Sequence, residues 1–242
     1  GITASTRRSD GKHPLVMFNI GPEIYKLKFR SQVPMSVQPV FTRFSSRYNG
    51  NQYTKIMREL VRDEARNSLV AKYIRDEIAQ GNYCLVLSRQ IKHLENISDA
   101  LGFEAREHSQ IVTGRLTRPV RDRLIQEMRD GDLRCILGTQ LFEEGVDIPR
   151  LNRIFLAFPG TEITALQKIG RGARQFEGKT DALVIDFVDE FVAPLARQWL
   201  RRKIWYRHVG LKVLKGIKEG RANGTEKKEG RKLLDQLRPK RS

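Results

Sequence analysis

The predicted fold depends most on residues 83–102, which read YCLVLSRQIKHLENISDALG. The first five form a short apolar run typical of a buried strand, and the polar Ser88 and Arg89 end it. A helix is predicted next, because apolar residues recur at helical spacing until Gly102, a residue type that favours helix ends. A strand joined to a helix by a short loop is the repeating unit of a parallel sheet.

The same unit recurs along the middle of the chain. A short strand is predicted at 109–112, and a helix follows that Thr117 and Pro119 open and Gly131 closes. Further apolar runs predict strands at 134–138, 153–158 and 182–187. Strands that alternate with helices predict a doubly wound α/β fold, with a parallel sheet and helices on both of its faces.

The flanking regions are less regular. Residues 33–44 are predicted to form an edge hairpin or ribbon, and residues 52–80 to form one or two polar helices. Another helix is predicted from near Asp189 to Leu211. Residues 216–230 are polar and interrupted by glycine, which predicts a frayed or disordered segment.

Charge indicates the class of partner. The chain has 242 residues, 39% of them hydrophobic, and a net charge of +17, of which the stretch 201–242 supplies +11 through 15 basic and 4 acidic residues. The excess favours a polyanion, and nucleic acid is favoured over a membrane because no apolar run approaches the ~18 residues of a spanning helix. The basic tail is either a clamp on a phosphate backbone or a solubilising extension.

The cysteines and histidines predict neither a disulfide nor a metal site. Cys84 and Cys135 each lie inside an apolar run, with neither the number nor the spacing of a zinc site. They are expected to be core residues in a reducing cytoplasm, since no signal peptide is visible. The four histidines are scattered without ligand spacing.

Residues 167–174, QKIGRGAR, form a candidate phosphate site. If the segment is helical, Arg171 and Arg174 lie on one face, and each guanidinium can donate two hydrogen bonds to phosphate oxygens. The preceding Gly170 allows backbone to approach a ligand closely. A solvated helix surface can carry the same letters, so the surrounding motifs decide between the two interpretations.

In doubly wound sheets, ligands bind where the strands end. Ser88 and Arg89 follow the first strand, and Thr139 follows the strand at 134–138. Thr139 offers a hydroxyl and a backbone N–H to a phosphate, Gly145 permits a turn with positive φ, and Asp147 is a candidate acceptor for a ribose hydroxyl.

These motifs, in this order, resemble the second RecA-like domain of a superfamily 2 helicase or translocase, from the first residue to about Phe187. The similar segments are motif III at 1–11, motif IV at 84–89, motif V at 138–149 and motif VI at 167–174. Residues 20–25 and the continuation of motif III look more like the DNA-acting relatives of XPB and UvsW than like DEAD-box RNA helicases. Motif VI also begins with Gln167, where the DEAD-box form has histidine.

The resemblance implies a role for each motif. ATP would lie between this domain and an N-terminal RecA-like domain, with Arg171 and Arg174 reaching the γ-phosphate as arginine fingers. The residues implied to contact the nucleotide are Gly145, Asp147, Gln167 and Gly170. Those implied to hold nucleic-acid phosphates are Ser88, Arg89, Thr113, Gly114 and Thr139. Thr3 and Ser5 would couple the two domains, and DNA is favoured over RNA.

The chain lacks two motifs of a complete motor. It contains no G-x-x-x-x-G-K-[ST] phosphate loop, and no Asp-Glu pair precedes Thr3. ATP and Mg²⁺ are therefore expected to be held mainly by the N-terminal domain, and this chain alone is expected to be inactive. The expected organisation is an inter-domain segment at 1–11, a connector at 12–80, the RecA-like domain at 81–210 and a basic tail at 211–242.

Two alternatives differ in class. A non-catalytic nucleic-acid-binding or interaction module could keep this fold without being part of a motor. A dinucleotide-binding oxidoreductase is disfavoured, because no G-x-G-x-x-G follows the first strand. The expected location is the cytoplasm, or the host cytoplasm for a viral protein. Unwinding, annealing and branch migration are equally compatible with the motifs.

Overall fold

The computed structural model describes residues 33–139, 148–160 and 176–218. Every element described below belongs to one unit of the chain, residues 31–242. No helix within the described ranges is long and apolar enough to cross a lipid bilayer.

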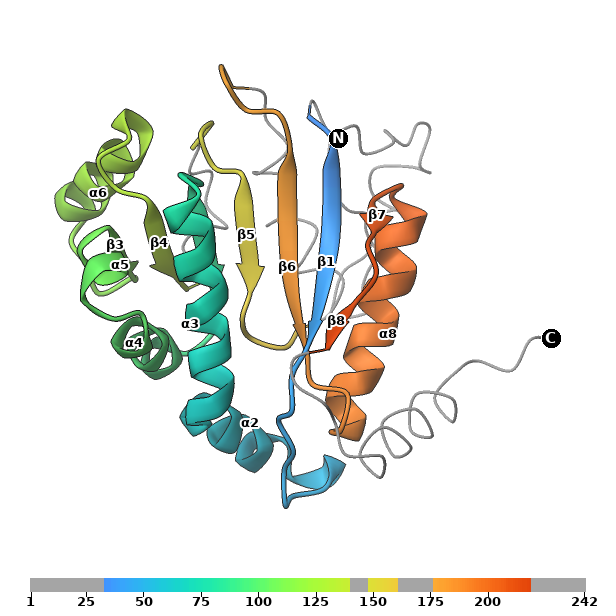
Figure 1. Cartoon of the computed structure of the whole chain (residues 1–242). Coiled ribbons are helices and arrows are strands. Elements are labelled where there is room, and N and C mark those ends of the chain that lie inside the picture. Colours follow the sequence, from blue (N-terminus) through green and yellow to red (C-terminus); the bar gives the residue numbers. More distant parts are fainter. Residues whose placement is uncertain (1–32, 140–147, 161–175, 219–242) are drawn as a thin grey trace, which may run out of the picture. The chain divides into compact units, whose positions relative to one another are not determined.

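The described strands form one sheet in which every pairing is parallel (Figure 1). The order is β3 (Ser109–Val112), β4 (Cys135–Gly138), β2 (Cys84–Leu87), β5 (Arg153–Leu156), β6 (Ala182–Val188), β1 (Met35–Phe41) and β7 (Lys212–Val213), and β8 (Ile217–Lys218) also pairs with β1. The parallel sheet expected from the alternating pattern is therefore confirmed.

The helices begin and end close to their sequence signals. Asp63 caps one helix by accepting the N–H of Arg66 at 2.7 Å. Another has a proline in its first turn and ends at Gly131, whose φ of 103° favours glycine. The described helices are η1 (Gly50–Gln52), α2 (Tyr53–Arg62), α3 (Glu64–Ala79), α4 (Ile91–Ala100), α5 (Phe103–Glu107), α6 (Arg118–Asp130) and α8 (Ala193–His208).

Helices cover both faces of the sheet. Ile185 and Phe187 of β6 pack in one hydrophobic cluster with residues of α3 and α4. Asp186 lies between them on the strand and contacts Arg202 and Tyr206 of α8 instead. Successive side chains of a strand point to opposite faces, so α8 covers the face opposite to α3 and α4. The predicted doubly wound arrangement is confirmed.

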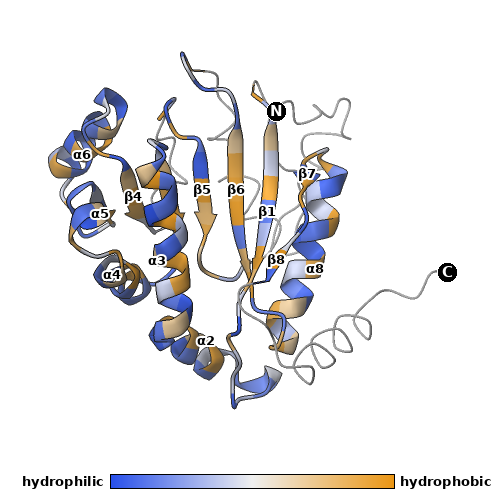
Figure 2. Cartoon of the chain, in the orientation of Figure 1, coloured by the Kyte–Doolittle hydropathy of each residue, from blue (hydrophilic) through white to orange (hydrophobic). Residues whose placement is uncertain are grey.

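The short central strands lie wholly or almost wholly in the core. Every residue of β2 and β4 is buried. Figure 2 shows hydrophobic residues concentrated on strands such as β4 and β6, whereas α3 and α6 alternate hydrophobic and hydrophilic residues. Cys84 and Cys135 are register neighbours on β2 and β4, and both are buried and unbonded, as predicted.

The prediction of an edge hairpin at 33–44 is wrong. Residues 35–41 form β1, which pairs in parallel along its whole length with β6. Its other side pairs with β7 at Ser36 and Val37 and with β8 at Val40 and Phe41, which leaves a gap at Pro39. Proline has no N–H to donate, so it fits a strand at such a gap.

Two predicted boundaries are also shifted. The connector expected at 12–80 includes β1 and α3, so the sheet domain begins well before residue 81. The tail expected at 211–242 begins with β7 and β8, and Lys218 forms an ion pair with Glu190. The last helix within the described ranges is α8, and Leu211 lies beyond its end.

Burial predicts that both thiols are unreactive in the folded protein. Burial raises the pKa of the Cys135 thiol to about 12 and also raises that of Cys84. We expect slow labelling by a thiol reagent at pH 8, and two thiols per chain to react in denaturant. Stoichiometric labelling within seconds under native conditions would contradict the described core.

Candidate nucleotide and nucleic-acid edge

Three predicted phosphate contacts come together where neighbouring strands end. Ser88, Thr113 and Thr139 directly follow β2, β3 and β4. These strands are adjacent and parallel, and their last residues are in register. The three residues therefore lie along the edge of the sheet at which its parallel strands end. We call this edge the carboxyl edge.

Ser88 is directed into the protein. The residue is only 2% exposed, and its Oγ lies 3.0 Å from Nδ1 of His93. The same oxygen accepts the backbone N–H of Gln90 at 3.1 Å. The hydroxyl thus holds the loop between β2 and α4 in place.

His93 is a buried, neutral partner for this hydroxyl. Burial lowers the pKa of His93 to about 3, and the positive charge of Arg66 contributes to the shift. The imidazole also contacts the ring of Phe158 edge-on, with centroids 5.8 Å apart. His93 therefore connects the loop after β2 to the segment after β5.

The loop after β3 exposes backbone and a cation. Thr113 is 6% exposed, and its hydroxyl accepts the N–H of Arg115 at 3.3 Å. Gly114 and Arg115 are exposed, as is Arg89 after β2. Neither arginine side chain has an acidic partner among the described residues. Arg115 was not predicted from the sequence, although its position next to Thr-Gly at a strand end was a usable signal.

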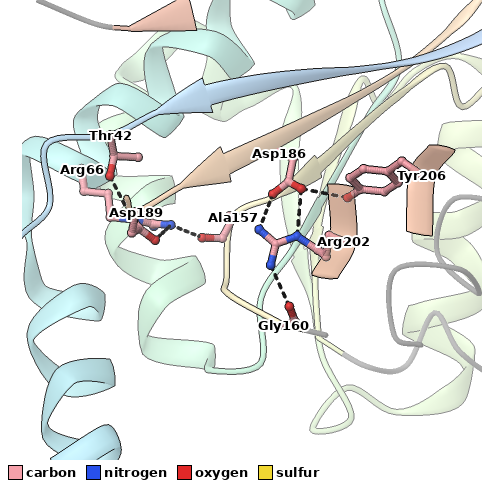
Figure 3. Close-up of polar contacts among 8 residues, drawn as sticks. All are labelled: Thr42, Arg66, Ala157, Gly160, Asp186, Asp189, Arg202 and Tyr206. Atoms are coloured by element: carbon pink, nitrogen blue, oxygen red, sulfur yellow. Dashed lines mark hydrogen bonds and ion pairs between the residues drawn. The ribbon is translucent and has the colours of Figure 1, made fainter. Parts of the chain in front are cut away.

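A buried ion pair lies where β1, β5 and β6 end (Figure 3). Arg66 of α3 donates to both carboxylate oxygens of Asp189, at 2.8 and 3.1 Å, and both side chains are 1% exposed. Thr42, directly after β1, donates its hydroxyl to the same carboxylate at 2.5 Å. Arg66 also donates to the backbone carbonyl of Ala157, after β5, at 2.8 Å.

A second buried pair approaches from the other face. Arg202 of α8 donates to both oxygens of Asp186 at 2.8 Å, and Tyr206 donates to the same carboxylate at 2.8 Å. Burial and the adjacent Asp186 carboxylate both raise the pKa of the Tyr206 hydroxyl, so it remains a donor. The third nitrogen of Arg202 donates to the carbonyl of Gly160 at 2.7 Å (Figure 3).

Sequence reasoning missed these two networks. Asp186 interrupts an otherwise apolar strand, which was a signal that a buried charge needs a partner. Arg202 lies on the same helix face as the buried Trp199 and Tyr206, at spacings of three and four residues. The identity of the partners depended on the packing of α8 against β6.

The remaining predicted site residues lie outside the described ranges. They are Thr3, Ser5, Gly145, Asp147, Gln167, Gly170, Arg171 and Arg174. The segments that resemble motifs V and VI both follow strands that end at the carboxyl edge. In the sequence, the first continues from Thr139, after β4, and the second lies beyond Gly160, after β5. Within the described ranges, no group of three or more His, Cys, Asp or Glu side chains is arranged to hold a metal ion.

Part of the chain is similar to a known protein family. Residues 65–175 match the helicase conserved C-terminal domain. This match, the curated relatives and the solved structures together support a C-terminal superfamily 2 helicase domain in this part of the chain. The matched region begins at the start of α3 and includes the strands β2, β3, β4 and β5.

Curated relatives of this helicase domain are longer proteins. It is 23% identical to the DNA 3'-5' translocase XPB2 of Sulfurisphaera tokodaii, over 84% of this chain and 55% of the relative. It is 28% identical to the UvrABC system protein B of Methanothermobacter thermautotrophicus, over 54% of this chain and 21% of the relative. The chain thus spans about half, or less, of the relatives it matches.

Solved structures share the fold of the helicase domain. T4 UvsW superposes with a TM-score of 0.62 at 19% identity, covering 76% of this chain and 42% of that protein. Dbp5 of S. cerevisiae, bound to RNA and ADP BeF3, superposes with a TM-score of 0.54 at 17% identity, covering 95% of this chain and 54% of that one. Both support a RecA-like fold.

The neutral His93 predicts a pH dependence of stability. Its pKa is lower in the folded than in the unfolded protein, so the unfolded state binds the proton more tightly, and the folded state loses stability as the pH falls below about 6.5. Between pH 7.5 and 5.5 this one group should lower the free energy of unfolding by about 1.4 kcal/mol.

The measurement is urea unfolding of the chain and of His93→Phe at both pH values. Phenylalanine keeps a ring against Phe158 but does not titrate. The variant should therefore lose less free energy of unfolding between the two pH values, by about that amount. His208→Gln is the control, because His208 is exposed on α8. An equal pH dependence in the original chain and His93→Phe would show that folding does not lower the pKa of His93.

Proposed function

We propose that this domain is the C-terminal motor half of an ATP-dependent nucleic-acid helicase or translocase. One observation carries the proposal: the chain segments that lead into motifs V and VI leave the sheet at the same carboxyl edge, after β4 and β5. A nucleotide bound along that edge would meet both motifs at once. Arg171 and Arg174 are proposed as arginine fingers, with Arg174 the first choice.

ATP and Mg²⁺ are assigned mainly to a partner domain. The described residues offer no acidic cluster for a metal, so no magnesium ligand is assigned among them. We propose that an N-terminal RecA-like domain holds the phosphates. Gly145, Asp147, Gln167 and Gly170 would then contact the nucleotide from this side, and Thr3 and Ser5 would couple the domains.

Nucleic acid is proposed to bind through its phosphates. Gly114 and Thr139 lie along the carboxyl edge, and Arg89 and Arg115 provide exposed cations beside them. Contacts to phosphate carry no base information, so binding should be nearly independent of sequence. Ser88 and Thr113 use their hydroxyls within their own loops, so we propose that they orient these loops. DNA is favoured, because one relative is named as a DNA translocase.

The alternative is a nucleic-acid-binding module with the same fold and no part in ATP turnover. The basic composition and the exposed arginines of the carboxyl edge suit both candidates. The two differ at Arg171 and Arg174, which a binding module has no reason to place against a γ-phosphate. Turnover measured on the intact protein therefore separates them.

The first functional prediction concerns Arg174→Ala in the intact protein. ATP turnover with saturating nucleic acid should fall by roughly 10³–10⁵, because an arginine finger stabilises charge that develops in the transition state. Affinity for nucleic acid should change less than twofold. Arg118→Ala is the matched control, since Arg118 is exposed on α6 and pairs with Asp122. An equal loss of turnover and affinity would mean that Arg174 holds nucleic acid.

The second prediction concerns Arg89→Ala combined with Arg115→Ala. Affinity for a duplex should fall, and the slope of log K against log salt should become shallower by up to ~0.9 per lost contact, for any base sequence. The control is Arg118→Ala combined with Arg123→Ala, which removes equal charge from arginines already paired on α6. Identical slopes for the two double variants would show that Arg89 and Arg115 do not contact the nucleic acid.

A further inference from the structure

The segment Ala157–Gly160 is held at both ends by buried arginines. Arg66 binds the carbonyl of Ala157 from the face of α3, and Arg202 binds the carbonyl of Gly160 from the face of α8. Between these contacts, the N–H of Phe158 donates to the carbonyl of Leu87 at 3.3 Å. A four-residue connection is thus held from both faces of the sheet and from the neighbouring strand β2.

Each arginine is itself held by a carboxylate near the end of β6. Asp189 and Asp186 each accept two hydrogen bonds from one guanidinium. In Arg202 the remaining nitrogen, Nη1, donates to Gly160, whereas in Arg66 a single nitrogen, Nη2, donates to both Asp189 and Ala157. Only arginine offers this geometry, because its planar fork has five donors, whereas lysine has a single ammonium group. The two arginines therefore do more than neutralise buried carboxylates.

We propose that Arg66 and Arg202 are positioning residues that together set the path of the backbone from Ala157 to Gly160. In the sequence, this backbone continues to Arg171 and Arg174. The catalytic part of the inference rests on the proposed function, in which these two residues meet the γ-phosphate. A displacement of about 1 Å in a catalytic group can lower turnover about 10²-fold.

The chain provides matched pairs of variants on both faces. Arg202→Lys keeps a positive charge beside Asp186 but loses the bond to Gly160, whereas Tyr206→Phe removes one bond to the same carboxylate and leaves Gly160 bound. Arg66→Lys and Thr42→Val form the corresponding pair at Asp189. Within each pair, only the first variant releases a carbonyl of the segment.

The first readout is hydrogen exchange in the present chain, and it does not depend on activity. Exchange of the peptide spanning residues 157–160 should be at least tenfold faster in Arg202→Lys and Arg66→Lys than in Tyr206→Phe and Thr42→Val, after correction for the unfolding midpoint of each variant. Equal exchange within each pair would overturn the claim that the arginines set the backbone path.

The second readout is steady-state ATP turnover in the intact protein. Arg202→Lys should lower kcat by roughly 10- to 100-fold with less than a threefold change in KM for ATP and in nucleic-acid affinity, while Tyr206→Phe should stay within about twofold. If Arg174→Ala abolishes turnover but Arg202→Lys behaves like Tyr206→Phe, the positioning role is rejected and the proposed function stands. If Arg174→Ala has no effect, the proposed function fails, and hydrogen exchange alone decides the backbone role.

Discussion

The arrangement of this domain depends on two buried carboxylates near the end of β6. Asp186 and Asp189 face opposite sides of the sheet, and each is neutralised by an arginine from a different helix. An ionised carboxylate inside a protein is very unfavourable unless it is paired and hydrogen-bonded, and removal of one partner of such a pair costs about 3–5 kcal/mol. The charges are tolerated only when α3 and α8 both pack against the strand, so the two helical layers and β6 depend on one another.

The carboxyl edge contains two kinds of polar side chain with different roles. Ser88 and Thr113 are buried, and their hydroxyls accept N–H groups of their own loops. Arg89 and Arg115 extend from those same loops into solvent. Inward hydroxyls restrict the loop backbone, and a restricted loop presents its neighbouring cation and amide groups with less loss of conformational entropy on binding. In the proposed function, these hydroxyls would support contacts of the neighbouring residues without making contacts themselves.

The strand β1 shows where sequence patterns become insufficient. Its alternating residues and Pro39 are typical of an edge strand, and a local hairpin was the simplest prediction. Its parallel partner β6 lies more than 140 residues away in the sequence, and its second side is covered by two very short strands. Local periodicity carries no information about such distant pairing. The strands β7 and β8 could not be predicted either, because a strand of two residues forms no detectable pattern.

The sequence by itself determined the fold class, the strands from Cys84 to Val188, the ends of α4 and α6, and the order in which the helicase motifs follow these strands. These features follow from local periodicity, from glycine and proline at helix ends, and from short spacings. Only the tertiary structure decided that β1 lies beside β6, that Ser88 faces His93, and that Arg66 and Arg202 bind the segment after β5. Each of these depends on which distant elements pack together, because a buried charge or hydroxyl is satisfied by whichever partner the packing brings within hydrogen-bonding distance.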